Sequence, residues 1–162
     1  MRIKNNLIEI LISLGVFVLL IQSSDPIYYT DSARYLNGSL IDPPLYSTII
    51  FLMKSIFGTL NSLVIFQTLI IGFSIIYLTR TFGTHFNLDI KLRILISILL
   101  FLPILKFYDI LLTEPIGYAF SLFFVSFMIK LIYNFNIQNL IWSTILAILL
   151  LLTRNQFLFI YP

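Results

Sequence analysis

The stretch LNSLVIFQTLIIGFSIIYLT, which runs from Leu60 to Thr79, decides the fold class. All 20 of its residues are uncharged, and most of them are large and apolar. A helix of this length rises about 30 Å, which is the thickness of the hydrocarbon core of a bilayer. The stretch therefore predicts a transmembrane helix.

The composition of the whole chain extends this prediction. The 162 residues are 59% hydrophobic and 10% charged, whereas soluble domains average about 25% charged residues. Because so few charges cannot cover a surface that faces water, most of the surface is expected to face lipid, and the length suits about five spans. The chain has no cysteine and a single histidine, His85, which excludes disulfides, thiolate metal sites and histidine clusters.

Four more apolar segments are predicted to cross the bilayer, and the polar stretches between them are predicted loops and turns. The loops are Arg80–Arg93 and Lys106–Glu114, and the turn is Asn134–Asn139. The four further spans are Leu7–Gln22, Ile94–Leu105, Pro115–Tyr133 and Leu140–Thr153.

The segment Leu45–Phe57 is apolar but differs from these spans. Its 13 residues rise only about 20 Å as a helix, which is short of the hydrocarbon core. It also carries a polar stripe at helical spacing that includes Ser47 and Lys54, so it is predicted to lie in the membrane interface. The expected fold is all-α: one polytopic transmembrane helical bundle over residues 1–162, with about five spans plus an interfacial helix.

Basic residues predict the orientation, because cytoplasmic loops are enriched in Lys and Arg. If Leu45–Phe57 does not cross, six basic residues lie on the side of the N-terminus and four on the other. We therefore expect a multi-pass protein of a bacterial or archaeal cell membrane with its N-terminus in the cytoplasm. Five of the seven acidic residues then lie outside, in the loops 23–44 and 106–114: Asp25, Asp31, Asp42, Asp109 and Glu114.

Two acidic loops on one side of a helical bundle can converge on a shared cleft. Carboxylates placed there could act as a general base and as a substrate or metal ligand. The alternative is that acids in loops are simply solvated. For Arg34 the alternative to a substrate contact is an ion pair with Asp31 in the same loop.

A set of short motifs narrows these possibilities. The first loop reads Asp31-Ser32-Ala33-Arg34-Tyr35-Leu36 and then Asp42-Pro43-Pro44-Leu45-Tyr46, the second ends Leu112-Thr113-Glu114-Pro115, and Leu152-Thr153-Arg154-Asn155 follows the last span. In order and spacing the set resembles the GT-C superfamily of membrane glycosyltransferases, in particular its aminoarabinose transferase and protein mannosyltransferase-like branch. The chain is shorter than a typical member, so we expect it to be the N-terminal portion of a longer GT-C module that inserts in membranes but transfers no sugar alone.

The resemblance implies an activity and roles for individual residues. The activity is transfer of a sugar from a polyprenyl-phosphate donor to a lipid, glycan or protein acceptor on the external face. Asp31 would be the catalytic base, and Glu114 would orient the acceptor or hold a divalent cation. Substrate binding would fall to Arg34, Tyr35, Asp42 and Arg154, with Arg34 at the donor phosphate. The alternatives are a non-enzymatic small membrane transporter or scaffold, or an inactive fragment of the transferase.

Overall fold

The computed structural model describes residues 2–22, 26–38 and 42–153, and within these ranges it describes every side chain except those of residues 2–7 and 9. Apart from one isolated β-bridge, the regular structure in these residues is helical. The helices are α1 (Arg2–Gln22), α2 (Ser32–Leu36), α3 (Pro44–Phe57), α4 (Asn61–His85), α5 (Ile90–Phe101), α6 (Ile104–Phe107), α7 (Glu114–Tyr133) and α8 (Ile137–Thr153).

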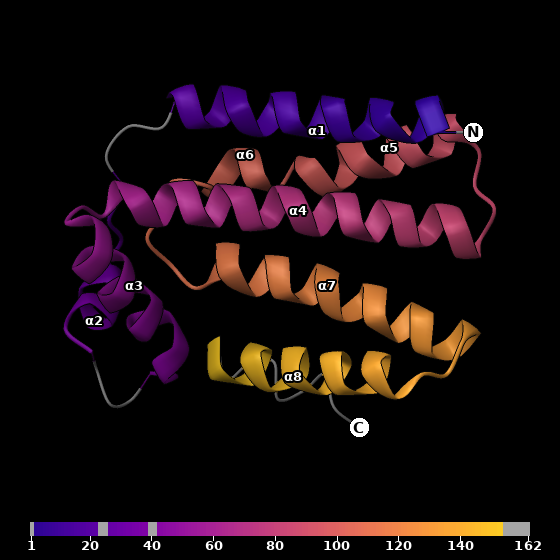
Figure 1. The fold of residues 1–162 in the computed structure, drawn as a ribbon. Helices are drawn as coiled ribbons and strands as arrows, with labels where there is room; N and C mark the ends of the chain where they lie inside the picture. The colour runs from indigo at the N-terminus through magenta and orange to yellow at the C-terminus, as the bar shows by residue number, and fades with distance from the viewer. Residues whose placement is uncertain (1, 23–25, 39–41, 154–162) are drawn as a thin grey trace.

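The long helices run side by side, and the connections between them gather at two opposite ends (Figure 1). One end, called the loop end below, holds α2, α3 and α6 and comprises residues 26–38, 42–60 and 102–114. The other, called the hairpin end, holds the tight connections from α4 to α5 and from α7 to α8, with the flanking residues 80–93 and 130–140. Both predicted acidic loops therefore meet at one end of the bundle.

Two of the described helices, α4 and α7, are long and apolar enough to cross a membrane. Helix α4 has 25 residues and rises about 37 Å. The apolar part of α1 from Ile10 to Gln22, and helix α8, are shorter than this, and α5 has only 12 residues. An all-helical fold with membrane-length helices is thus confirmed in the described residues, whereas a bundle of five spans stays a prediction.

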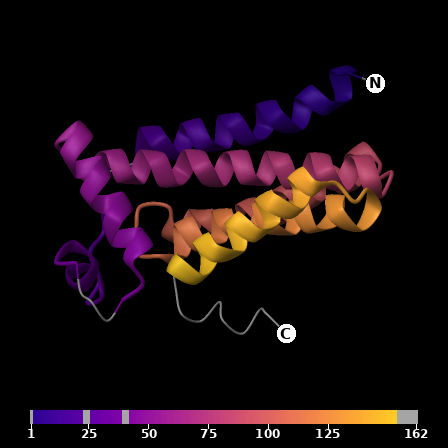
Figure 2. The same cartoon turned by 60° about the horizontal axis from the view of Figure 1, so that its bottom comes forward.

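Helix α3 forms where the interfacial helix is expected, and it lies crosswise to the long helices at the loop end (Figures 1 and 2). Pro44 begins the helix, and Gly58 ends it with a left-handed φ of 74°. Tyr46 and Ile50 are buried against the bundle. The outer face leaves Phe51 and Ile56 exposed beside Lys54, the mixed surface of a helix that lies at an interface.

Two connections predicted from the sequence are too long. The turn predicted at Asn134–Asn139 ends early because α8 begins at Ile137, and the larger error is in the loop predicted at Arg80–Arg93. Arg80–His85 continues α4 and Ile90 already begins α5, so only residues 86–89 form the connection. The polar side chains in α4's last turns do not end the helix, because Thr81 and Thr84 donate hydrogen bonds to carbonyls within it. Helix α5 starts early because Asp89 caps it, accepting a bond from the Leu92 N–H at 2.8 Å.

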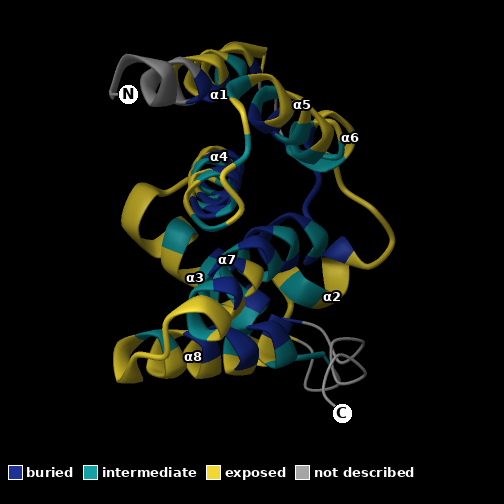
Figure 3. Cartoon of the chain, turned by 90° about the vertical axis from the view of Figure 1, so that its right-hand side faces the viewer, coloured by how far each residue is buried: buried dark blue, intermediate teal, exposed yellow. Residues whose placement is uncertain are grey.

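The helices pack through small residues and interlocking apolar side chains. The main apolar core joins α1, α4 and α7 and includes Ile12, Ile71 and Leu122. A Cβ on Gly72 would lie 2.6 Å from Val16 Cγ2, so glycine is needed where α1 approaches α4, as is common between membrane helices. Viewed along the bundle, exposed residues cover the outward faces of α1 and α8 while α7 is largely enclosed (Figure 3).

Charge is distributed unequally between the two ends. Of the five described acidic side chains, only Asp89 lies at the hairpin end, whereas the others lie at the loop end. Basic residues with described side chains lie at both ends: Arg80, Lys91, Arg93 and Lys130 at the hairpin end, and Arg34, Lys54 and Lys106 at the loop end. The helix order therefore separates the charges as predicted, and the cytoplasmic position of the N-terminus stays a prediction.

Candidate functional site

The two acidic loops are held together by backbone hydrogen bonds. Ile27 and Ile110 form an isolated parallel β-bridge, in which the Ile27 N–H donates to Asp109 O at 2.9 Å and the Leu111 N–H donates to Ile27 O at 3.0 Å. The first loop thus joins the segment that leads into α7. This pairing fixes the position of α2, which begins five residues later.

Ser32 provides a second attachment between the loops. Its fully buried hydroxyl donates to Leu111 O at 2.7 Å and accepts from the Tyr29 N–H at 2.8 Å. Ser32 faces the second loop, whereas the neighbouring Asp31, Ala33 and Arg34 are exposed. The sequence analysis gave Ser32 no role, although it lies inside the quoted motif.

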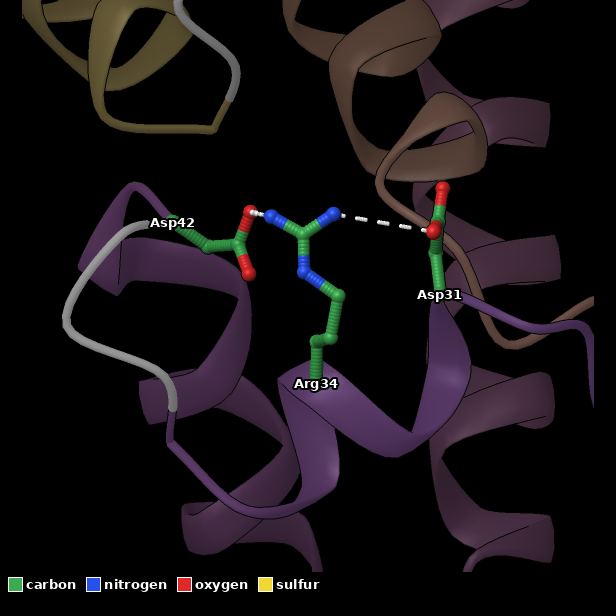
Figure 4. Close-up of polar contacts among 3 residues, drawn as sticks. All are labelled: Asp31, Arg34 and Asp42. Carbon is green, nitrogen blue, oxygen red and sulfur yellow. Dashed lines mark hydrogen bonds and ion pairs between the residues drawn. The ribbon is translucent and has the colours of Figure 1, made fainter.

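Arg34 lies between two carboxylates at the surface of the loop end (Figure 4). Its Nη2 donates to Asp42 Oδ1 at 2.6 Å, and its Nη1 lies 3.6 Å from Asp31 Oδ1. The Asp31 side chain is 58% exposed and that of Asp42 only 10%. The ion pair with Asp31 expected as the alternative role of Arg34 is therefore present, and a stronger one with Asp42 is added to it.

Asp42 is the least accessible member of this group. One of its oxygens, Oδ2, is buried and has no hydrogen-bond partner in the described part of the chain. A buried acceptor without a partner is costly. A donor group from a substrate hydroxyl would satisfy it, which agrees with the substrate-binding role predicted for Asp42.

Tyr46, a buried residue of α3, connects the first loop to the second. Its ring is fully buried and packs edge-on against Tyr35, with centroids 5.3 Å apart. Its hydroxyl donates to Gln67 Oε1 at 2.9 Å, and Gln67 Nε2 donates to the carbonyls of Tyr108 and Ile110 at 3.3 Å each. This buried polar network ties α3 and α4 to the second loop.

Glu114 is close enough to this network to affect it electrostatically. Burial, followed by the charges of Glu114 and Tyr35, raises the pKa of Tyr46 well above its ordinary value. Glu114 itself is the first residue of α7, half-buried, with the Thr113 hydroxyl 3.4 Å from its Oε2. Its position also stabilises the start of the helix, because the N-terminal dipole favours an acid.

The predicted site residues thus fall into two linked sets at one end of the bundle. Asp31, Arg34 and Asp42 form the exposed ion-pair group, while Tyr35 and Glu114 flank the buried Tyr46. Arg154 lies outside the described residues. Gln67 was overlooked as a site residue, although a lone amide in an apolar span is a usable signal.

The described residues contain no group of three or more Asp, Glu, His or Cys side chains that could hold a metal ion. Binding of a divalent cation by Glu114 stays a prediction. Comparisons of the chain with known protein families, with curated proteins and with solved structures gave no match.

Proposed function

We propose that this chain forms the donor- and acceptor-binding end of a multi-pass membrane glycosyltransferase of GT-C type. The reaction is transfer of a sugar from a polyprenyl-phosphate donor to an acceptor hydroxyl or amine on the external face. The observation that carries the proposal is the meeting of both acidic loops at one end of an apolar helical bundle. The loop end then faces outward and the N-terminus lies in the cytoplasm, as basic residues at the hairpin end favour.

Asp31 is the residue best placed to act as the base. Its carboxylate is exposed and does not cap α2, so it is free of a structural hydrogen bond to the helix. In the proposed step, the acceptor heteroatom forms a bond to the anomeric carbon and the bond from that carbon to the phosphate oxygen breaks. The acceptor proton moves to Asp31, and the electron pair of the broken bond stays on the polyprenyl phosphate.

Arg34 and Asp42 support this step by position and charge. Because Arg34 is shared between Asp31 and Asp42, its guanidinium holds the Asp31 carboxylate in place. The unpartnered Asp42 Oδ2 accepts a hydrogen bond from a sugar hydroxyl. Glu114 lies on the adjoining helix, where it orients the acceptor.

The rival proposal, a transporter or scaffold, needs polar side chains that line a path between the helices. Six buried hydroxyls of α4, α5, α7 and α8 do not provide one. Each donates a hydrogen bond to a carbonyl three or four residues earlier in its own helix, so it is already satisfied by the backbone. These residues are Thr68, Ser74, Thr79, Ser97, Ser126 and Ser143. This pattern favours the enzyme.

The test is to express the protein with its full reading frame in a host that lacks a matching transferase. Transfer from polyprenyl-phosphate sugars is then measured in isolated membranes. Asp31→Asn keeps the volume but removes the base, and we expect it to reduce the rate at least about 100-fold. Asp89→Asn is the matched control, because Asn also caps a helix well and the residue lies at the hairpin end. Near-normal transfer by Asp31→Asn would reject Asp31 as the base.

A further inference from the structure

A cavity of about 730 Å³ lies between the end of α2 and the outer face of α3. Its wall on α3 is formed by residues at helical spacing, among them Ser47, Phe51, Lys54 and Ser55. Tyr35 and Asn37 line the opposite side. This volume is within the usual range for sites that bind small molecules.

One side chain that lines the cavity carries a positive charge that no described carboxylate neutralises. Lys54 forms no ion pair among the described residues, whereas Arg34 already contacts two carboxylates. An anion that bound Arg34 would have to compete with Asp42 at 2.6 Å. An anion that bound Lys54 would displace only water, so Lys54 is the better phosphate ligand at the loop end.

A second feature of the cavity points to the same kind of ligand. The Ser47 hydroxyl is buried and has no hydrogen-bond partner in the part of the chain that is described. It can turn toward a phosphate oxygen without breaking an existing bond. Ile50, Phe51 and Leu60 give the same cavity an apolar wall. A cation and a hydroxyl beside an apolar wall suit a ligand that has one anionic group and an apolar tail, such as a phosphorylated lipid.

We propose that the cavity between α2 and α3 binds a phosphate group, with Lys54 supplying the charge and Ser47 a further hydrogen bond. The inference rests on the proposed function in assigning this phosphate to a polyprenyl-phosphate donor. The donor would enter along α3, whose Phe51 and Ile56 are 70% and 66% exposed. Lys54 would then hold the phosphate, while Arg34 positions Asp31.

Direct binding to the full-length protein in detergent or nanodiscs tests the proposal without any need for transfer. The probes are farnesyl phosphate, farnesol and inorganic phosphate. We expect Lys54→Gln to weaken farnesyl phosphate binding at least about tenfold, since charge-assisted hydrogen bonds are lost. Lys54→Arg should retain binding. Lys106→Gln, which removes an exposed cation at the same end, should have no effect.

The three probes also separate the sources of the phosphate. Tighter binding of farnesyl phosphate than of inorganic phosphate, with the same dependence on Lys54, supports the lipid donor. Equal binding of both supports the phosphate site but assigns it to the free anion. Farnesol binding as tightly as farnesyl phosphate would overturn the proposal. So would a loss of binding in Arg34→Gln that Lys54→Gln does not share.

Thiol labelling gives a second measurement that does not depend on removing Lys54. Because the chain has no cysteine, Ser55→Cys places a single thiol on the cavity wall. Farnesyl phosphate should slow its reaction with a maleimide. Thr48→Cys lies exposed on α3 outside the cavity, and its labelling should not change. Protection of neither thiol, or of both equally, would contradict the assignment.

Discussion

At the hairpin end, four residues join α4 to α5 and three join α7 to α8, whereas 21 residues separate α1 from α3 at the loop end. Short connections do no more than reverse the chain. The long connection folds into α2, pairs with the segment before α7 and carries most of the charged groups of the candidate site. The comparison shows that neighbouring long helices can be joined by only a few residues, so the extra chain at the loop end is where the proposed binding and chemistry would lie.

Accessibility from the two sides of a membrane gives the largest expected contrast. Ala33 and Thr84 are both exposed and lie at opposite ends of the bundle. In intact cells, Ala33→Cys should react nearly completely with an impermeant thiol reagent, and Thr84→Cys should not react until the membrane is opened. The reverse pattern would invert the orientation. Ser32→Cys is unsuitable for this test, because Ser32 is fully buried.

The next contrast concerns hydrogen bonds between elements. Gln67→Leu removes the side chain to which Tyr46 and two backbone carbonyls at the loop end are hydrogen-bonded. The substitution should lower the free energy of unfolding by about 2–3 kcal/mol. Thr79→Val removes a hydroxyl that bonds only within α4, and should change it by less than about 0.5 kcal/mol. Unfolding in mixed micelles with a denaturing detergent measures both. Equal costs would show that the loop end does not depend on its buried network.

Alkaline pH should act on the loop end through Tyr46. Its pKa in the folded protein is raised above the ordinary value of 10.0, so the folded state favours the protonated hydroxyl. The contribution of Tyr46 to the free energy of unfolding is fully present below pH 10. It is lost as pH rises from there toward the pKa of Tyr46 in the folded protein, by about 1.4 kcal/mol per pH unit. Tyr46→Phe should remove this part of the slope. An unchanged slope in Tyr46→Phe would contradict this prediction.

The smallest expected effects come from two glycines. Gly58 has a φ of 74° with open space around its Cβ position, so Gly58→Ala should destabilise by about 1 kcal/mol through backbone strain alone. At the hairpin end, a Cβ on Gly83 would lie 2.5 Å from Arg93 Nε. The long Arg93 side chain can shift, and alanine favours the helix, so Gly83→Ala should stay within about 0.5 kcal/mol. A larger cost at Gly83 than at Gly58 would mean that the hairpin end is the more rigid one.

The sequence predicted the helices well where apolar length and proline decide them. Helix α3 begins at Pro44 and ends at Phe57, within one residue of the prediction, and α7 ends at Tyr133 as expected. The error at Arg80–Arg93 has a physical cause. Polar residues lower hydropathy without breaking a helix, whereas Asp89 before an apolar run was a capping signal that could have located the true boundary.

The candidate site was predictable in its location but not in its contacts. The counting of basic residues placed both acidic loops on one side, and the structure joins them there. The pairing of Tyr46 with Gln67, and of Ser32 with Leu111, depends on how distant segments pack, which no local pattern encodes. The contact of Arg34 with Asp42 was missed because the two residues are eight positions apart, and no local pattern places them together.

The bond between Ser32 and Leu111 has a consequence for biogenesis. The two residues are 79 positions apart in the chain. At a synthesis rate of about 5–20 residues per second, Leu111 leaves the ribosome about 4–16 s after Ser32. During that interval the segment with Asp31 and Arg34 lacks the residues with which it pairs. In the proposed topology its assembly has to wait until α5 has inserted, and a stall between α4 and α7 would leave an unpaired, charged loop open to surface proteases.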